Sequence, residues 1–159
     1  YYAGGDKDDI WAIRPYVLEC QGDDPVNDNW IEKGKMQRAD GDEFSFEAFS
    51  LDATVFEVNN VWYYIWAEKV GVGKQISNLY IARMKNGYTL DTVQVLLTTP
   101  DYDWERFGFW VTVDEKGEDI MVYHARIETE IVGNPLYHPN RHAMLMQIKW
   151  EDGRPVFEF

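Results

Sequence analysis

The sequence is poor in cysteine, in basic residues and in long apolar runs. Its single cysteine, Cys20, cannot form an internal disulfide, which argues against a disulfide scaffold and leaves the compartment open. No apolar run approaches the roughly 18 residues that would span a membrane, and the first residues lack the charged and then apolar pattern of a secretion signal. We therefore expect no membrane partner, and the localisation stays unknown.

Basic residues are scarce beside acidic ones, with 15 Lys and Arg against 28 Asp and Glu and a formal net charge of −13. Such a charge repels phosphate backbones, so we expect no nucleic-acid partner. A neutral oligosaccharide would not be repelled. An acidic surface also serves solubility alone, and this interpretation of the charge stays open.

Aromatic residues, in contrast, are abundant: they make up 16% of the 159 residues, and 45% of the chain is hydrophobic. This is enough material for one soluble β-rich domain with a real core. Residues 50–57 and 62–68 are both rich in β-branched and aromatic residues and meet at Asn59 and Asn60, which tolerate the positive φ of a tight turn. We predict a hairpin here, which two further runs extend to a four-stranded meander: residues 77–84 and 93–97.

The same pattern recurs in the second half of the chain, with strand-like runs at residues 108–113, 120–127, 144–150 and 155–159. Three more runs precede the first meander: residues 1–3, 10–19 and 30–35. A repeated four-stranded unit of about 40–50 residues is typical of a β-propeller blade. The sequence therefore predicts an all-β fold, a partial β-propeller of about two and a half to three four-stranded blades. The blade units of this single domain are expected at 1–40, 50–98 and 107–159.

Several segments also carry a family resemblance. They are IRPYVLEC at 13–20, SLDATVFE at 50–57, NLYIA at 78–82, LLTTP at 96–100, DWER at 103–106, VYHAR at 122–126, and NPLY and NRH between 134 and 142. In this order they resemble glycoside hydrolase family 43, the five-bladed propellers of arabinofuranosidase and xylosidase type. The resemblance covers almost the whole chain and implies an arabinose- or xylose-containing oligosaccharide as partner.

Three carboxylic acids serve catalysis in the family that this chain resembles. They are an Asp general base in the first blade, an Asp in the second that tunes the acid, and a later Glu general acid, a division that suits an inverting hydrolase. Asp52 stands in the second position. The base is expected upstream of Tyr1, and the Asn-Glu-Gly-Pro context of the acid is absent after residues 108–111. The chain looks shortened by about a blade and a half, with the ends fused inside one strand, so we expect hydrolysis to be weak or lost.

Asp52 and the rings that follow it are the first candidate site. An ionised Asp52 could tune an acid or accept a hydrogen bond from a sugar hydroxyl, although an Asp at a strand start also serves simply to form a turn. The rings of residues 62–66 alternate across the sheet, so at most one face can line a pocket and most of them are expected in the core. Trp66 is the ring that we assign to substrate binding.

The loop at 101–106 is the second candidate, because it follows a proline and crowds acids, rings and a guanidinium together. Loops on a rigid scaffold commonly carry binding groups, and an indole face can stack on a sugar ring. We assign Trp104, Glu105 and Arg106 to substrate binding. The alternative is a solvated loop in which Arg106 pairs with Asp103 or Glu105.

His124 is the third candidate, because the family often directs a histidine at this place toward the central channel. Arg126 should face the same side and could hold a carboxylate, while a purely structural His124 is the alternative. No cofactor is expected, but the resemblance leaves a calcium ion near His124 open. His138 and His142 are four apart, yet the intervening Pro139 argues against a helical metal pair.

Two functions follow from the sequence. The first is a family 43-like glycosidase with weak or no activity, using Asp52 and a substitute acid such as Glu105 or Glu115. The second is a non-catalytic sugar-binding or purely structural half-propeller. Because so few blades leave open strand edges, we predict a homodimer that completes a ring, with residues 157–159 helping to pair the edge.

Overall fold

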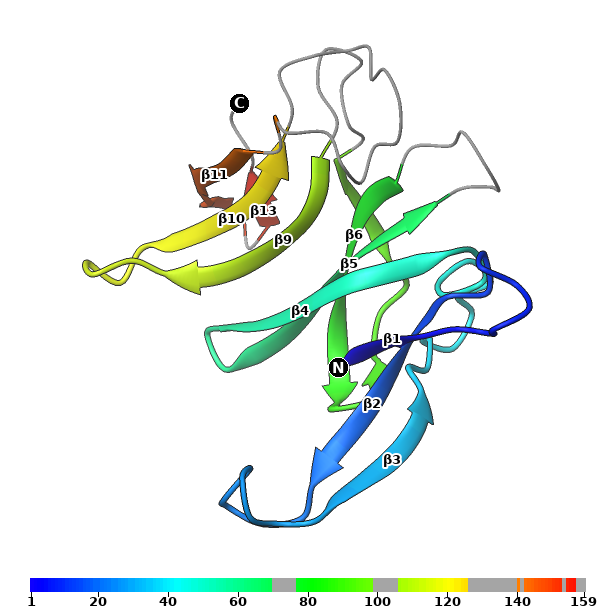
Figure 1. Ribbon diagram of the computed structural model, residues 1–159. Helices are drawn as coiled ribbons and strands as arrows, with labels where there is room; N and C mark the ends of the chain where they lie inside the picture. Colours follow the sequence, from blue (N-terminus) through cyan, green and yellow to red (C-terminus); the bar gives the residue numbers. More distant parts are fainter. Residues whose placement is uncertain (70–76, 99–105, 126–139, 141, 153, 157–159) are drawn as a thin grey trace.

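The computed structural model describes residues 1–159 except 70–76, 99–105, 126–139, 141, 153 and 157–159 (Figure 1). The described residues form small antiparallel sheets, which confirms the predicted all-β class. No helix in this part of the chain is long and apolar enough to cross a membrane.

The first sheet contains β1 (Tyr2–Gly4), β2 (Arg14–Cys20) and β3 (Trp30–Lys35), in the order β1-β2-β3. The sequence predicts three runs here but starts the second at residue 10, too early. The Asp9 carboxylate accepts a hydrogen bond from the Trp11 amide at 2.9 Å, and the Asp9 carbonyl accepts one from Ala12 at 3.1 Å. This Asx turn keeps the chain out of the extended conformation and delays the strand.

The second sheet is the meander predicted around residues 50–97. It contains β4 (Ser50–Val58), β5 (Val61–Lys69), β6 (Ser77–Asn86) and β7 (Thr89–Leu90), and β8 (Val95–Thr98) also pairs with β6. Asn59 and Asn60 join β4 to β5 with φ values of 52° and 63°. The predicted turn chemistry is therefore confirmed, because such φ values match the right-handed twist of a tight hairpin.

The third sheet contains β9 (Arg106–Val113), β10 (Asp119–Ala125) and β11 (His142–Gln147), in the order β11-β10-β9. The predicted strand at 144–150 is interrupted after Gln147. Strand β11 ends where its partner β10 begins: Ile148 is buried, and its amide donates to the carbonyl of Asp119, the first residue of β10, at 2.8 Å. The chain then forms a separate two-stranded sheet from β12 (Lys149–Glu151) and β13 (Arg154–Val156).

Strand β5 is buried on both faces. Tyr64 and Trp66 belong to a cluster that includes Val17 of the first sheet, whereas Ile65 belongs to a second cluster that includes Met121 of the third. Alternating side chains of a strand point to opposite faces, and burial of each large apolar side chain contributes about 1.5–3 kcal/mol. The second sheet therefore lies between the other two, as a blade lies between its neighbours.

Strands β1, β4 and β9 are the first strands of their sheets, and β4 contacts both of the others. Figure 1 shows the β4–β5 and β9–β10 hairpins pointing the same way, so β4 and β9 run in the same general direction.

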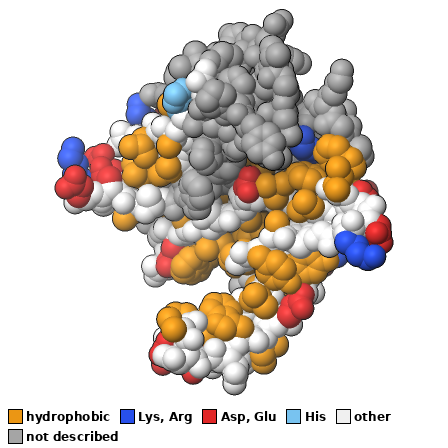
Figure 2. All heavy atoms as spheres, viewed as in Figure 1, with side chains coloured by type: hydrophobic (Ala, Val, Ile, Leu, Met, Phe, Trp, Pro, Cys, Tyr) orange, Lys and Arg blue, Asp and Glu red, His pale blue; other side chains and the backbone are white. Residues whose placement is uncertain are grey.

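The outer face of the first sheet is apolar. Figure 2 shows hydrophobic side chains gathered over the β2–β3 hairpin, where Leu18 and Trp30 are 42% and 49% exposed. At the other end of the chain Leu145, on strand β11, is 71% exposed. Apolar surface therefore remains on the outer sheets of the described structure.

Candidate functional site

Asp52 lies on a β-bulge near the start of β4. Leu51 pairs with Ala67 and Thr54 pairs with Ile65, so two residues of β4 stand opposite Trp66 alone. Asp52 has a φ of 52°, in the left-handed region that Asp adopts more readily than most residues. Bulges of this kind redirect side chains and are common beside active sites.

The bulge directs Asp52 toward a hollow between β4 and the first sheet. This pocket has a volume of about 250 Å³ and is lined by residues of three segments: Tyr1, Tyr2, Ala3, Pro15, Leu51, Asp52 and Ala53. Asp52 is exposed. A carboxylate in such a position can accept hydrogen bonds from a molecule that enters the pocket.

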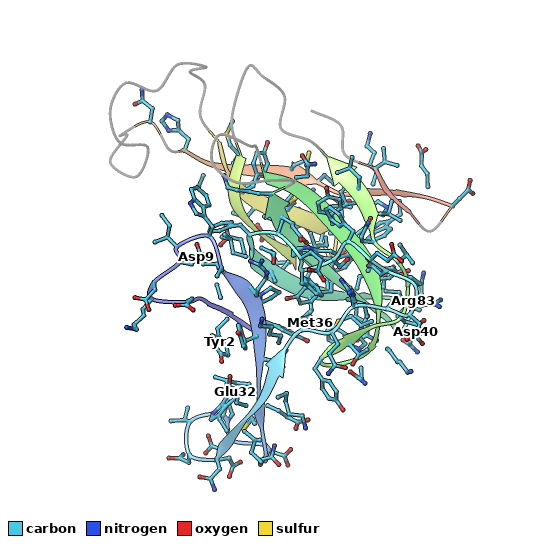
Figure 3. The ribbon with its side chains drawn as sticks, turned by 90° about the vertical axis from the view of Figure 1, so that its right-hand side faces the viewer. Tyr2, Asp9, Glu32, Met36, Asp40 and Arg83 are labelled. Atoms are coloured by element: carbon cyan, nitrogen blue, oxygen red, sulfur yellow. The ribbon has the colours of Figure 1, made fainter. Side chains whose placement is uncertain are left out.

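Two tyrosines of the N-terminal segment form part of the wall of the pocket that Asp52 also lines. The Tyr1 hydroxyl donates to the Gly87 carbonyl at 2.7 Å, and its ring meets the edge of Tyr64 at 5.2 Å between centroids. The Tyr2 hydroxyl donates to Glu32 of β3 at 2.7 Å, and these two side chains lie close together in Figure 3. The wall is therefore tied to both the first and the second sheet.

A buried carboxylate, Glu68 of β5, lies beneath the start of β4. It is 0% exposed and accepts three hydrogen bonds: from the Phe46 amide at 3.0 Å, the Ala48 amide at 2.9 Å and Trp66 Nε1 at 2.8 Å. Burial raises the pKa of Glu68, while these donors and the charge of Arg14 oppose the rise. Phe46 has a φ of 66°, a strained conformation for an aromatic residue that costs of order 1–3 kcal/mol.

A second carboxylate, Asp42, holds the other end of the same loop. It is 4% exposed and accepts hydrogen bonds from the Phe44 amide at 2.9 Å, the Ser45 amide at 3.0 Å and the Ser45 hydroxyl at 2.6 Å. Burial acts to raise the pKa of Asp42, but the bonds from Ser45, Phe44 and the Gln94 backbone outweigh it and lower the pKa. The loop that leads to Asp52 therefore rests on two buried acids.

Trp66, assigned to substrate from the sequence, lies in the core. It is 0% exposed and packs against Phe46 and Tyr80, with ring centroids at 5.0 and 5.8 Å. A sugar could reach this ring only after the packing opened. The structure thus gives Trp66 a place behind the bulge and not on the pocket wall.

The other predicted site residues belong to β9, β10 or their flanks. Arg106 pairs with Ala125, and His124 pairs with Phe107 and Ala143, so the backbones of Arg106 and His124 are neighbours at one end of the β9–β10 hairpin. Their side chains are outside the description. Trp104, Glu105 and Arg126 lie outside the described residues altogether, as do residues 157–159, and their assigned roles stay predictions.

The predicted calcium position depends on His124, of which only the backbone is described. Within the described residues, no group of three or more His, Cys, Asp or Glu side chains is arranged to hold a metal ion.

The role of Glu68 is the feature that sequence reasoning missed. The signal was present, because Tyr64, Trp66 and Glu68 alternate along one strand and must share a face. An acid that shares a face with two aromatic residues is a candidate for a buried, hydrogen-bonded carboxylate.

Comparisons with known proteins identify this architecture. No family model matches the chain. The extracellular exo-α-(1→5)-L-arabinofuranosidase of Streptomyces avermitilis is 28% identical over 228 positions, covering 99% of this chain and 46% of the relative. The solved α-L-arabinofuranosidase of Lactobacillus brevis is 30% identical with a TM-score of 0.55, covering 98% of this chain and 68% of that one. The Cellvibrio cellulosa α-L-arabinanase, solved with arabinohexaose, is similar in fold, with a TM-score of 0.57 at 15% identity, covering 94% and 58%.

This chain spans about half the length of the curated relatives that it matches. The alignment of 228 positions is also longer than the 159 residues of this chain, so the Streptomyces relative contains positions with no counterpart here. This agrees with the internal shortening expected from the sequence.

The first and third sheets pack on the two faces of the second, and this arrangement, with the matching structures, defines part of a β-propeller. The Lactobacillus enzyme is 30% identical over nearly the whole chain and over 68% of its own length, which is enough to identify the family of this propeller. The chain belongs to glycoside hydrolase family 43, with the arabinofuranosidases and arabinanases.

Proposed function

We propose that this chain recognises arabinose-containing glycans at the pocket beside Asp52 and hydrolyses their glycosidic bonds weakly or not at all. The observation that carries the proposal is the bulge, which presents a left-handed, exposed Asp52 to a pocket of about 250 Å³. That volume lies below the range of about 300–1,000 Å³ of pockets for drug-sized ligands, so it suits one terminal sugar ring. The named activities of the relatives supply the sugar class.

The expected weakness in hydrolysis rests on the number of carboxylates that the reaction needs. Hydrolysis with inversion uses one carboxyl group as general acid and a second as general base. By resemblance Asp52 is neither of these, but the acid that orients and tunes the general acid. Its direct contribution here is to accept a hydrogen bond from a sugar hydroxyl.

Two measurements test this function. The first is hydrolysis of aryl α-L-arabinofuranosides and aryl xylosides by the wild type and by Asp52→Asn, with exposed Asp40→Asn as the matched control. The second is calorimetry with arabino- and xylo-oligosaccharides at millimolar concentration. We expect sugar binding that Asp52→Asn weakens and Asp40→Asn retains. A wild type without turnover and without heat of binding contradicts the proposal.

A second candidate function is a structural half-propeller that binds a second copy of itself. The exposed apolar side chains of Leu18 and Trp30 on one outer sheet, and of Leu145 on the other, favour it. In two copies related by a two-fold axis, the first-sheet face of each copy could pack against the β11 face of the other, and these two contacts would close a ring. Light scattering at micromolar concentration should then report twice 18.7 kDa, and Trp30→Ser should give the monomer. A monomeric wild type excludes this function.

A further inference from the structure

We propose that Glu68 is the positioning residue for Asp52: its buried carboxylate holds both sides of the bulge in the geometry that turns Asp52 into the pocket. This inference rests on the proposed role of Asp52 in sugar recognition.

The first side of the bulge is the segment that leads into β4. Glu68 Oε2 accepts the Phe46 amide at 3.0 Å and Oε1 accepts the Ala48 amide at 2.9 Å. The Ala48 carbonyl in turn accepts the Ser50 hydroxyl at 3.1 Å. Ser50 also pairs with Glu68 across the ladder, two residues before Asp52. The Glu68 side chain thus holds two points on the path by which the chain reaches Asp52.

The second side is Trp66, the residue of β5 that stands across from the bulge. Its Nε1 donates to Glu68 Oε2 at 2.8 Å, and its ring packs against Phe46 at 5.0 Å between centroids. Glu68 Oε2 therefore joins the loop amide of Phe46 to the indole of Trp66. The fixed indole keeps β5 in place opposite the extra residue of β4.

The strained backbone shows what the carboxylate opposes. Phe46 and Asp52 have φ values of 66° and 52°, so both adopt a conformation that L-residues seldom enter. Such conformations persist only where the surroundings over-determine them. Without Glu68 as acceptor for its amide, Phe46 is no longer held in the left-handed conformation, and the bulge can relax toward regular pairing. A shift of one residue turns a strand side chain to the opposite face, so Asp52 would leave the pocket.

The decisive variant is Glu68→Gln, which keeps the shape but replaces one accepting oxygen by an NH₂ donor that faces other donors. Glu57→Gln is the matched control, because Glu57 is an exposed acid on the same hairpin. Nuclear magnetic resonance of the backbone amides reports the bulge directly. We expect the Asp52 and Ala53 amide signals to move in Glu68→Gln and to stay in place in Glu57→Gln.

Sugar recognition gives the second readout. If the wild type turns over an aryl arabinofuranoside, Glu68→Gln should lower kcat about 10–100-fold, because a small misplacement of a reacting group has an effect of that size. In the Asp52→Asn background the same change should add little, since both variants act on one group. Where only binding is measurable, the affinity of an arabino-oligosaccharide replaces kcat in this comparison.

Trp66→Phe is the second variant in case Glu68→Gln does not fold. It removes one donor and keeps a ring, so the Asp52 and Ala53 signals should move in the same direction by a smaller amount. Asp52 and Ala53 signals that do not move in a folded Glu68→Gln or Trp66→Phe variant overturn the inference. So does a loss of kcat or affinity in Glu68→Gln that adds fully to the loss in Asp52→Asn. A wild type that neither binds nor cleaves sugar refutes the proposed function, but the amide signals still decide whether Glu68 positions the bulge.

Discussion

Asp52 stands opposite Trp66 at a point where two residues of β4 face one residue of β5. Asp52 is exposed, whereas Trp66 is 0% exposed. A solvent-facing acid and a core side chain therefore lie on adjacent strands at the bulge. The left-handed backbone at Asp52 lets the strand carry the extra residue. The geometry of the pocket therefore depends on the packing of Trp66, which does not line the pocket itself.

Substitution of Asp52 by glycine and by alanine should separate backbone strain from side-chain function. With a φ of 52°, Asp52→Ala should lower the free energy of unfolding by about 1 kcal/mol, because alanine enters the left-handed region at that cost. Asp52→Gly should lose less. Urea unfolding measures both, and an Asp52→Gly variant less stable than Asp52→Ala contradicts the bulge geometry.

Tyr64→Phe should stabilise the fold. The Tyr64 hydroxyl is buried and is the one buried side-chain polar atom without a hydrogen-bond partner in the described structure. Burial also raises the pKa of this group, so it stays neutral. Removing an unsatisfied polar atom should raise the free energy of unfolding by about 1 kcal/mol. Tyr80→Phe is the control, since its hydroxyl accepts a hydrogen bond from Asn78 at 3.2 Å and its loss should not stabilise. A destabilised Tyr64→Phe would show that the hydroxyl has a partner in solution.

Asp42→Asn should weaken the fold at neutral pH and matter less in acid. The pKa of Asp42 is lowered, so the folded state favours the ionised form, and its stabilisation is present above the unfolded pKa and lost as pH falls through the folded one. Loss of hydrogen bonds to a charged group should cost about 2 kcal/mol at neutral pH. Urea unfolding across pH measures the difference, with Asp40→Asn as an exposed control. A constant difference between wild type and Asp42→Asn from neutral pH down to acid would contradict the assignment.

Glu68 should show the opposite trend. Burial raises its pKa, so between the unfolded and the folded pKa the folded state holds a proton that the unfolded state has released. The stabilisation from this group is complete below the unfolded pKa and falls as pH rises through the folded pKa. The stability of the wild type relative to Glu68→Gln should therefore decrease from mildly acidic to neutral pH, whereas relative to Glu57→Gln it should not. A difference that grows with pH would mean that the three donors outweigh burial.

Local chemistry explains which parts of the fold were predictable. The hairpin at Asn59 and Asn60 follows from turn residues beside two β-rich runs, so the sequence contains all of its causes. The end of β11 depends instead on where its partner β10 begins, at Asp119, which is distant in sequence. Alternation could place Trp66 on a face, but only contact with the first sheet shows that this face is buried.

The same limit applies to the candidate site. Asp52 was predictable from the family resemblance, because its neighbours at 50–57 match the family. Its bulge was not, since the extra residue is defined only by pairing with β5. The three bonds of Glu68 join residues 46, 48 and 66, and no local pattern brings the first two to the third.

Because β5 is buried on both faces, neighbouring residues of this strand pack against different sheets. Ile65 shares a cluster with Met121 of the third sheet, and Trp66 shares a cluster with Val17 of the first. A change at either position is transmitted to a different half of the molecule although one peptide bond joins them. Substitutions at odd-numbered positions of β5 therefore alter the packing against the third sheet, and substitutions at even-numbered positions alter the packing against the first.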